Sequence, residues 1–256
     1  MKIRFLGTGT STGNPEIGCS CEVCTSSDKR DERLRASVLI ETDGKRLLID
    51  CGPDFRQQML CAQQTEKYTE IDGVLLTHEH YDHVGGLDDL RVFCAKGAVE
   101  IFAEDYVAQA IRTRIAYVFK EHKYPGVPNL RMNEIGNAPF SVAGINIIPI
   151  RLLHGRLPIL GYRIADFAYL TDLKTIPEEE YAKLENLDVL VINALRHKEH
   201  ISHQTVADAI RQVEKIKPKQ TYLTHVSHHF GLHSVMEKTL PETVAIAYDG
   251  LEILMI

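Results

Sequence analysis

The sequence predicts an α/β protein, in which short buried strands alternate with amphipathic helices. Apolar runs at residues 73–76, 146–153 and 187–193 have the length of buried strands, and each leads into polar residues, where α/β folds place their chemistry. Apolar residues recur at helical spacing over residues 206–216. With 256 residues, 44% hydrophobic and 25% charged, the chain can bury a sizeable core. We expect one compact domain of two similar halves over residues 1–256.

The charge balance argues against long polyanions as partners. The net charge is −6, the pI is about 6.1, and the charged segment 29–35 mixes both signs. Residues 1–7 are too short and too charged for a signal peptide, and no run reaches the length of a membrane span. We therefore expect a cytoplasmic protein without membrane contact.

The first elements are a strand over Lys2–Leu6, a glycine-rich turn, and a β-hairpin. The turn lacks the Gly-Lys-Ser/Thr ending of a phosphate-binding loop. Residues 36–42 and 45–49 are β-rich and are joined by Asp43-Gly44, a strong hairpin signal. The hairpin leads to Asp50, which would be costly to bury alone, so we expect it to accept hydrogen bonds from the histidine-rich segment that follows.

A cysteine-rich loop at residues 18–25 lies between these elements. Cys19, Cys21 and Cys24 stand within six residues, and six cysteines in the whole chain are too few for a disulfide scaffold. In a reducing compartment, three neighbouring thiols predict a tetrahedral structural zinc that lacks its fourth ligand. A redox-labile surface loop is the alternative.

The most informative segment is Thr77-His78-Glu79-His80-Tyr81-Asp82-His83, directly after a short apolar strand. The period of two in extended chain turns His78 and His80 to the same side. Asp82 and His83 follow where the chain turns into Gly85-Gly86, and they can face a second point nearby. Three histidines and one aspartate at the end of a buried strand would disfavour one another without a cation, so the segment predicts a pair of metal ions.

The rest of the chain continues the alternation. We expect helices over 54–64, 87–95 and 105–120, a helix with capping-box spacing that opens at Thr175-Ile176-Pro177-Glu178, and a helix over 206–216 that Pro218 ends. We expect strands over 99–103, 140–142, 145–153, 160–165, 168–171 and 187–193, and a closing hairpin of 244–248 and 251–256 around Asp249-Gly250.

Polar residues follow several of these later strands. His154 and Asp172 stand at strand ends, and His225 follows the strand that ends in Tyr222-Leu223-Thr224. His228 stands three residues after His225, so it points to a neighbouring but separate position and is the candidate fourth zinc ligand. We treat His229 and His233 as ordinary residues.

The motif HxHxDH resembles the signature of the metallo-β-lactamase superfamily, and the resemblance extends over essentially the whole chain. It implies a four-layer αβ/βα sandwich of two mixed β-sheets flanked by helices, with two metals in the cleft between the halves. Carried over to this sequence, the ligands of one metal are His78, His80 and His154, those of the other are Asp82, His83 and His225, and Asp172 bridges them. Such a pair activates a shared water for hydrolysis. Manganese, zinc and iron all suit these ligands.

The Cys loop, the HxHxDH motif and the ending Leu-Thr-His-Val-Ser-His together resemble the phosphodiesterases of the carbon-phosphorus lyase pathway. That resemblance implies a small phosphodiester substrate, such as a cyclic ribosyl phosphate or a 2′,3′-cyclic nucleotide, and a possible homodimer. It assigns catalytic roles to Asp82 and to His203, the latter as general acid or phosphate contact. His197 and His200 compete with His203 for this role.

Three alternatives remain open. A tRNA 3′-end endonuclease shares the metal site, but the acidic balance and the lack of a basic Gly/Pro arm argue against it. A quinone-cofactor biosynthesis protein of the same superfamily also carries a Cys-rich loop. A non-catalytic zinc-binding module would not need seven ligands outside that loop.

Overall fold

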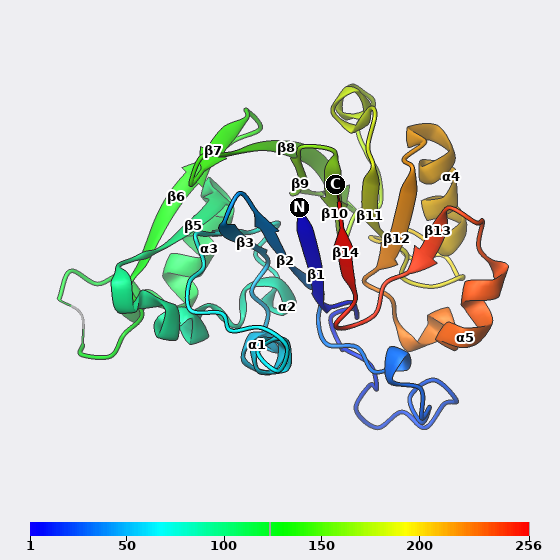
Figure 1. Ribbon diagram of the computed structural model, residues 1–256, viewed down its shortest axis with the longest axis horizontal. Helices are drawn as coiled ribbons and strands as arrows, with labels where there is room; N and C mark the ends of the chain where they lie inside the picture. Colours follow the sequence, from blue (N-terminus) through cyan, green and yellow to red (C-terminus); the bar gives the residue numbers. More distant parts are fainter. Residues whose placement is uncertain (123, 256) are drawn as a thin grey trace.

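Two seven-stranded β-sheets pack face to face in the computed structural model, which describes residues 1–122 and 124–255 (Figure 1). The strand order is β14-β1-β2-β3-β4-β5-β6 in the first sheet and β13-β12-β11-β10-β9-β8-β7 in the second. Each sheet contains parallel and antiparallel neighbours, and helices cover its outer face. The expected four-layer αβ/βα sandwich is confirmed.

The strands of the two sheets come from both ends of the chain. The first sheet comprises β1 Lys2–Gly7, β2 Ser37–Thr42, β3 Lys45–Ile49, β4 Gly73–Leu75, β5 Val99–Glu104, β6 Leu130–Ile135 and β14 Glu252–Leu254. The second comprises β7 Phe140–Val142, β8 Ile145–His154, β9 Leu157–Ile164, β10 Phe167–Leu170, β11 Val189–Asn193, β12 Gln220–Thr224 and β13 Val244–Ile246. The Asp43-Gly44 hairpin between β2 and β3 is confirmed.

The helices are short. The α-helices are α1 Phe55–Ala62, α2 Tyr81–Val84, α3 Asp105–Arg114, α4 Val206–Ile216 and α5 His233–Met236. The 3-10 helices are η1 Lys29–Asp31, η2 Leu87–Lys96, η3 Ala116–Val118, η4 Glu178–Leu184, η5 His228–Phe230 and η6 Glu237–Thr239. Within residues 1–122 and 124–255, no helix is long and apolar enough to cross a membrane.

Strand side chains alternate between two hydrophobic layers. In β2, Leu39 faces the layer beneath α1 and α3, whereas Val38 and Ile40 face the second sheet. In β3, Leu48 faces the helices and Leu47 the other sheet. Burial on both faces explains why the strands are continuous apolar runs rather than alternating ones.

Two expectations for individual elements are wrong, and a third holds in another helical form. The capping box at Thr175 is absent: Thr175 is extended and hydrogen bonded to Leu153, so η4 begins only at Glu178 and has no side-chain cap. The helix expected over residues 87–95 is present, as the 3-10 helix η2. The segment predicted over 105–120 stops being α-helical after Arg114.

The expectation of a closing hairpin is also wrong, because its two strands lie in different sheets. β13 pairs with β12, and β14 pairs with β1. The carboxylate of Asp249 accepts hydrogen bonds from the Leu34 backbone N–H at 2.6 Å and from the Thr8 hydroxyl at 2.7 Å, which hold the crossover against the N-terminal segment. Residue 256, at the end of the expected hairpin, lies outside the described residues.

Candidate metal centre

The seven residues expected to hold two metal ions lie together where β4, β8, β10 and β12 end. Their ligand atoms form two groups, each with all atoms within 4.8 Å of one another: His78, His80 and His154 in one, and Asp82, His83, Asp172 and His225 in the other. The first sheet supplies the residues of the HxHxDH motif, and the second sheet supplies the rest.

The three histidines of the first group face one another. The ring centroids of His78 and His80 are 4.5 Å apart, and that of His154 lies 5.7 and 5.2 Å from them. The Nε2 atom of His78 is buried and has no hydrogen-bond partner. A buried nitrogen lone pair without a partner costs free energy, whereas a divalent cation would satisfy it, so these residues fit a metal ion.

The second group combines two histidines with two carboxylates. His83 Nε2 lies 3.1 Å from Asp172 Oδ2 and 3.2 Å from Asp82 Oδ2, and His225 Nε2 lies 3.2 Å from Asp172 Oδ1. Neither Nε2 atom makes a well-formed hydrogen bond at these distances. Because acceptor atoms converge on one point, this group fits a second cation.

Three residues of this region adopt left-handed backbone conformations. Asp50, Asp172 and His225 have φ values of 61°, 59° and 54°, and each stands one or two residues after the end of a strand. This conformation costs a residue other than glycine about 1 kcal/mol, and such strain is common at functional sites. Here it turns the side chain out of the strand direction at the sheet edge where the ligands meet.

Asp50 supports the histidine-rich segment, as expected. It accepts hydrogen bonds from His83 Nδ1 at 2.7 Å and from the Thr77 backbone N–H at 2.9 Å. The Thr77 hydroxyl also bonds to Asp50 and lies 3.0 Å from His78 Nδ1. Both histidines therefore carry hydrogen on Nδ1 and present Nε2 to the cluster. The supporting role of Thr77 is not evident from the sequence, where it is an ordinary polar residue.

The ionised carboxylates of the cluster favour a positive charge among its side chains, either a proton or a cation. Burial opposes ionisation of Asp172, but the neighbouring imidazoles of His225 and His83 outweigh it and hold the pKa of Asp172 well below its usual range. Burial, together with His83, lowers the pKa of His78, which keeps its lone pair free. Despite its burial, the carboxylates of Asp172, Asp82 and Asp50 raise the pKa of His83 well above its usual value. The ionised carboxylates and the neutral imidazole of His78 suit a divalent cation, and a cation bound by His83 would replace the proton that these carboxylates favour.

One of the three candidates for the general acid, His203, borders this cluster. Its Nε2 lies 3.1 Å from Asp172 Oδ1, and its ring centroid lies 4.5 Å from that of His154. His200 lies behind it, with 3.0 Å between the two Nδ1 atoms. His197 points elsewhere, because its Nε2 is 3.0 Å from the carbonyl oxygen of Phe230.

The Cys loop forms a separate group with His228. The Nδ1 atom of His228 lies 3.1, 3.6 and 3.3 Å from the sulfurs of Cys19, Cys21 and Cys24. Tetrahedral zinc at ordinary bond lengths would separate sulfur and nitrogen ligands by ~3.6 Å. The four residues therefore fit the expected structural zinc, and the residue three positions after His225 is the one that completes the set.

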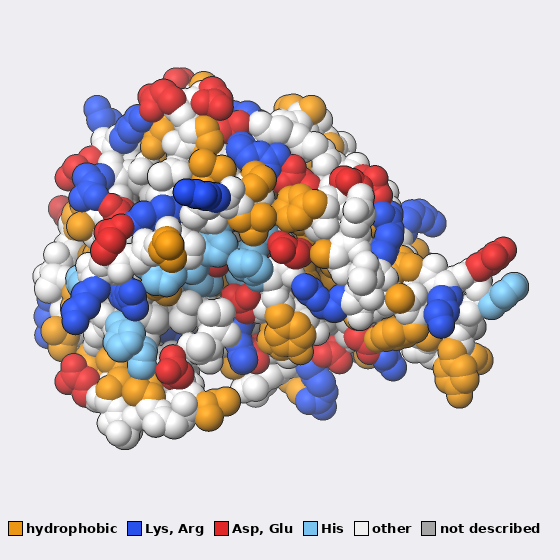
Figure 2. All heavy atoms as spheres, turned by 180° about the vertical axis from the view of Figure 1, so that it is seen from behind, with side chains coloured by type: hydrophobic (Ala, Val, Ile, Leu, Met, Phe, Trp, Pro, Cys, Tyr) orange, Lys and Arg blue, Asp and Glu red, His pale blue; other side chains and the backbone are white. Residues whose placement is uncertain are grey.

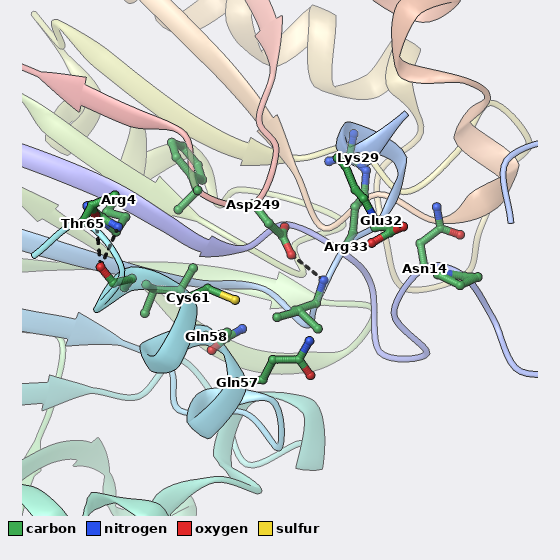
Figure 3. A pocket seen from close by; sticks show the side chains of 16 residues that line it. Arg4, Asn14, Lys29, Glu32, Arg33, Gln57, Gln58, Cys61, Thr65 and Asp249 are labelled. Atoms are coloured by element: carbon green, nitrogen blue, oxygen red, sulfur yellow. Dashed lines mark hydrogen bonds and ion pairs between the residues drawn. The ribbon is translucent and has the colours of Figure 1, made fainter. Parts of the chain in front are cut away.

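The histidine cluster opens to one face of the molecule. Figure 2 shows histidine side chains at the floor of a hollow, with charged and hydrophobic side chains around it. A different cavity, of about 520 Å³, lies between α1 and the segment that contains η1 (Figure 3). Asp249 lines one side of it and Gln58 and Cys61 line the other, and it contains none of the predicted site residues.

Comparison with known proteins agrees with this architecture. The family model of the β-lactamase superfamily domain matches residues 45–226. A crystal structure of a diphosphatase from the PhnP family superposes with a TM-score of 0.91 at 37% identity, over 98% of this chain and 96% of that one.

Two curated relatives carry other names. An octanoyltransferase of Porphyromonas gingivalis is 50% identical over 255 residues, which are 98% of this chain and 51% of the relative. A coenzyme PQQ synthesis protein B of Xanthomonas oryzae is 28% identical over 175 residues, which are 62% of this chain and 54% of the relative. The chain thus spans about half the length of these curated relatives.

The family match covers more than half of the sequence and includes all seven residues of the candidate metal centre, and the fold is the one expected for that family. The chain belongs to the β-lactamase superfamily.

Proposed function

We propose that the protein is a dinuclear metal-dependent phosphodiesterase that hydrolyses small cyclic phosphates or cyclic nucleotides. The superfamily fold and the similarity to a diphosphatase support a metal-dependent hydrolase. The step from hydrolase to phosphodiesterase is supported mainly by Asp172, because it contacts both ligand groups. Its two carboxylate oxygens face His83 and His225 of the second group. Its backbone carbonyl accepts a hydrogen bond from Nδ1 of His154, which belongs to the first group.

The side chains of the cluster divide the work. His78, His80 and His154 would hold one cation, Asp82, His83 and His225 the other, and Asp172 both. When bound, two such cations supply an activated water and neutralise charge on the phosphoryl oxygens. Asp50 keeps His83 oriented, and the backbone carbonyls of Asp172 and Ser202 do the same for His154, at 2.7 and 3.0 Å from its Nδ1.

His203 is the residue that we assign to the leaving group. It is not among the seven ligands expected from the sequence, although its ring lies within 4.8 Å of ligand atoms of His154 and Asp172. Its Nε2 lies 3.1 Å from Asp172 Oδ1, and its side chain is 12% exposed. When protonated on both nitrogens, the imidazole in this position can donate a hydrogen bond from Nε2 to a phosphoryl oxygen or to the oxygen that leaves. His203 Nε2 lies beside Asp172, whereas His197 Nε2 lies beside the carbonyl oxygen of Phe230, and these positions support His203 rather than His197 in this role.

A diphosphate is the second candidate substrate, because the relative that superposes at 37% identity is called a diphosphatase. Both bonds are cleaved by attack of water on phosphorus, and they differ in whether an alcohol or a phosphate leaves. The leaving phosphate is stable as an anion and needs less help from His203 than an alcohol does.

The name octanoyltransferase suggests a different chemistry for the longer relative. This chain spans only 51% of that protein, so acyl transfer or thioester hydrolysis is a competing outcome to be measured. A tRNA 3′-end endonuclease is disfavoured by the net charge of −6. A role in quinone-cofactor synthesis rests on the 28% identical relative alone.

A substrate panel tests the proposal. The purified protein would be loaded with manganese or zinc and assayed on bis(p-nitrophenyl) phosphate, a 2′,3′-cyclic nucleotide, a dinucleoside diphosphate, p-nitrophenyl phosphate and an octanoyl thioester. We expect hydrolysis of the diesters and little of the monoester. Equal rates on the monoester, or activity on the thioester alone, would refute the phosphodiesterase assignment. Activity on the diphosphate alone would replace it with the second candidate.

A further inference from the structure

His200 and His203 form a histidine pair behind the metal cluster. Their Nδ1 atoms are 3.0 Å apart, which is a hydrogen-bond distance between two nitrogens. Two imidazole nitrogens in such contact need one hydrogen between them, so one ring donates and the other accepts. The direction of this hydrogen bond determines whether Nδ1 of His203, the ring nitrogen that faces His200, carries a hydrogen.

The backbone decides the direction. The Ser202 N–H points to His200 Nδ1 at 3.3 Å, and a backbone N–H can only donate. His200 Nδ1 is therefore an acceptor, and the hydrogen shared with His203 belongs to His203 Nδ1. The Ser202 hydroxyl lies 3.2 Å from His203 Nδ1 and 3.4 Å from His200 Nδ1, so it can also join this contact.

The charges around His200 favour its neutral, accepting form. Burial lowers the pKa of His200, and the positive charges of Arg196 and Lys174, together with His154, lower it further, against the opposing effect of Glu199. A neutral imidazole keeps the Nδ1 lone pair that the hydrogen bond needs.

We propose that His200 is a positioning residue: it accepts a hydrogen bond from His203 Nδ1–H and thereby holds His203 Nε2 in the metal cleft. The Nε2 atom is the one that lies 3.1 Å from Asp172. Without His200, the His203 ring can rotate and its two nitrogens can exchange roles. The arrangement corresponds to a histidine oriented by a carboxylate in other hydrolases, with a second histidine in the carboxylate's place. This inference rests on the proposed function of His203.

Variants at residue 200 can either remove the hydrogen-bond acceptor or keep one. His200→Ala removes the acceptor, whereas His200→Asp supplies a carboxylate, which in its ionised form can only accept. We expect His200→Ala to lower kcat by about 10- to 100-fold with little change in KM, because losing a partner that orients a catalytic-site group has effects of this size. His200→Asp should retain most of the activity. His197→Ala is the matched control, since it removes a histidine from the same loop that points away from the cluster.

A double-mutant cycle separates positioning from a general structural effect. If His200 acts through His203, then His200→Ala should cause no further loss of kcat in a His203→Ala background. The loss should also be larger for a diester with a poor alcohol leaving group than for bis(p-nitrophenyl) phosphate, because a good leaving group needs little hydrogen bonding. Additive losses, or a loss equal for both leaving groups, would overturn the proposal.

A measurement without turnover keeps the inference separate from the proposed function. In zinc-loaded protein with nitrogen-15-labelled histidine, the His203 ring, assigned by its absence in His203→Ala, should carry hydrogen at Nδ1, and His200→Ala should change this signal while His197→Ala does not. A wild-type ring that carries hydrogen only at Nε2 would refute the positioning role. If the spectra agree but no phosphate substrate is cleaved, the proposed function fails and the pair remains.

Discussion

Asp172 is the carboxylate of the candidate metal centre that contacts residues of both ligand groups. It is 2% exposed, has a φ of 59°, and contacts histidines from both sides of the cluster. Replacing it with alanine removes both carboxylate oxygens from the region between the two ligand groups. We expect Asp172→Ala to lower turnover by well over 100-fold, beyond the range for losing a merely supporting partner.

The same variant should keep the metal of the Cys loop. Metal analysis of Asp172→Ala should find about one zinc per chain, held by Cys19, Cys21, Cys24 and His228. Asp166→Ala, an exposed carboxylate in the turn before β10, is the control and should keep wild-type turnover and metal content. Absence of zinc from Asp172→Ala would contradict the picture of two independent metal sites.

His233 is an ordinary residue by sequence but a buried polar one in the fold. Arg33 Nη2 lies 3.1 Å from His233 Nδ1, and because a guanidinium has no lone pair, the imidazole must accept and stay neutral. Burial, together with Arg33, lowers the pKa of His233 in the folded protein. The unfolded chain binds a proton there near pH 6.5 and the folded one does not, so this residue makes stability fall as pH decreases below that value.

We therefore expect His233→Asn to flatten the pH dependence of stability between about pH 7 and pH 5. Asparagine can still accept from Arg33 but does not titrate, although its smaller side chain should lower stability at every pH. Urea unfolding at several pH values measures both effects. His122→Ala, which removes an exposed histidine, should leave the slope unchanged. An identical slope in wild type and His233→Asn would show that the buried imidazole is not the titrating group.

The Cys loop is an element without helix or strand. Residues 18–25 form only turns and irregular chain, so the thiols and His228 would connect the N-terminal segment to the start of η5 through a metal. We expect Cys21→Ser to lose the structural zinc and to lower the melting temperature, since structural zinc contributes directly to folding. Cys61→Ser, at an exposed thiol outside the loop, should change neither zinc content nor melting temperature.

Whether an element could be predicted depended on how completely it is buried. β4 and β11 are buried along their whole length, and both follow from their apolar runs. β6 is missing from the sequence prediction because it is an edge strand in which only Leu130 is buried and the other residues, Arg-Met-Asn-Glu-Ile, are exposed or half-buried without regular alternation. The capping box at Thr175 failed because pairing with Leu153 competes for the same backbone groups.

The whole molecule brings its two halves together at the metal cluster. The first sheet provides the residues after β4, and the second provides His154, Asp172 and His225. Cations bound there would link the sheets and favour the folded state by about 2.7 kcal/mol at a concentration of 100 times their dissociation constant. We expect the melting temperature to rise with added manganese, which suits imidazole and carboxylate ligands better than thiolates.

Thermal unfolding at increasing manganese concentration measures this linkage. Asp172→Ala should show a much smaller rise, whereas Cys21→Ser should show the wild-type rise from a lower starting temperature. A rise of equal size in Asp172→Ala would place the stabilising manganese somewhere other than this cluster.

The sequence alone determined the parts of this protein that are local. The HxHxDH segment, the three thiols and the apolar strands are each encoded within a few residues, and so are the strand ends at which His154, Asp172 and His225 stand. These features sufficed for the four-layer fold, through the family resemblance, and for both candidate metal sites.

Only the tertiary structure decided which distant residues meet. It placed His203 beside Asp172 and His197 against Phe230, sent β13 and β14 to different sheets, and put Thr77 next to His78 and Arg33 against His233. These contacts join residues by packing of whole sheets and by backbone hydrogen bonds, and such long-range pairing leaves no periodicity or spacing in the chain that could reveal it beforehand.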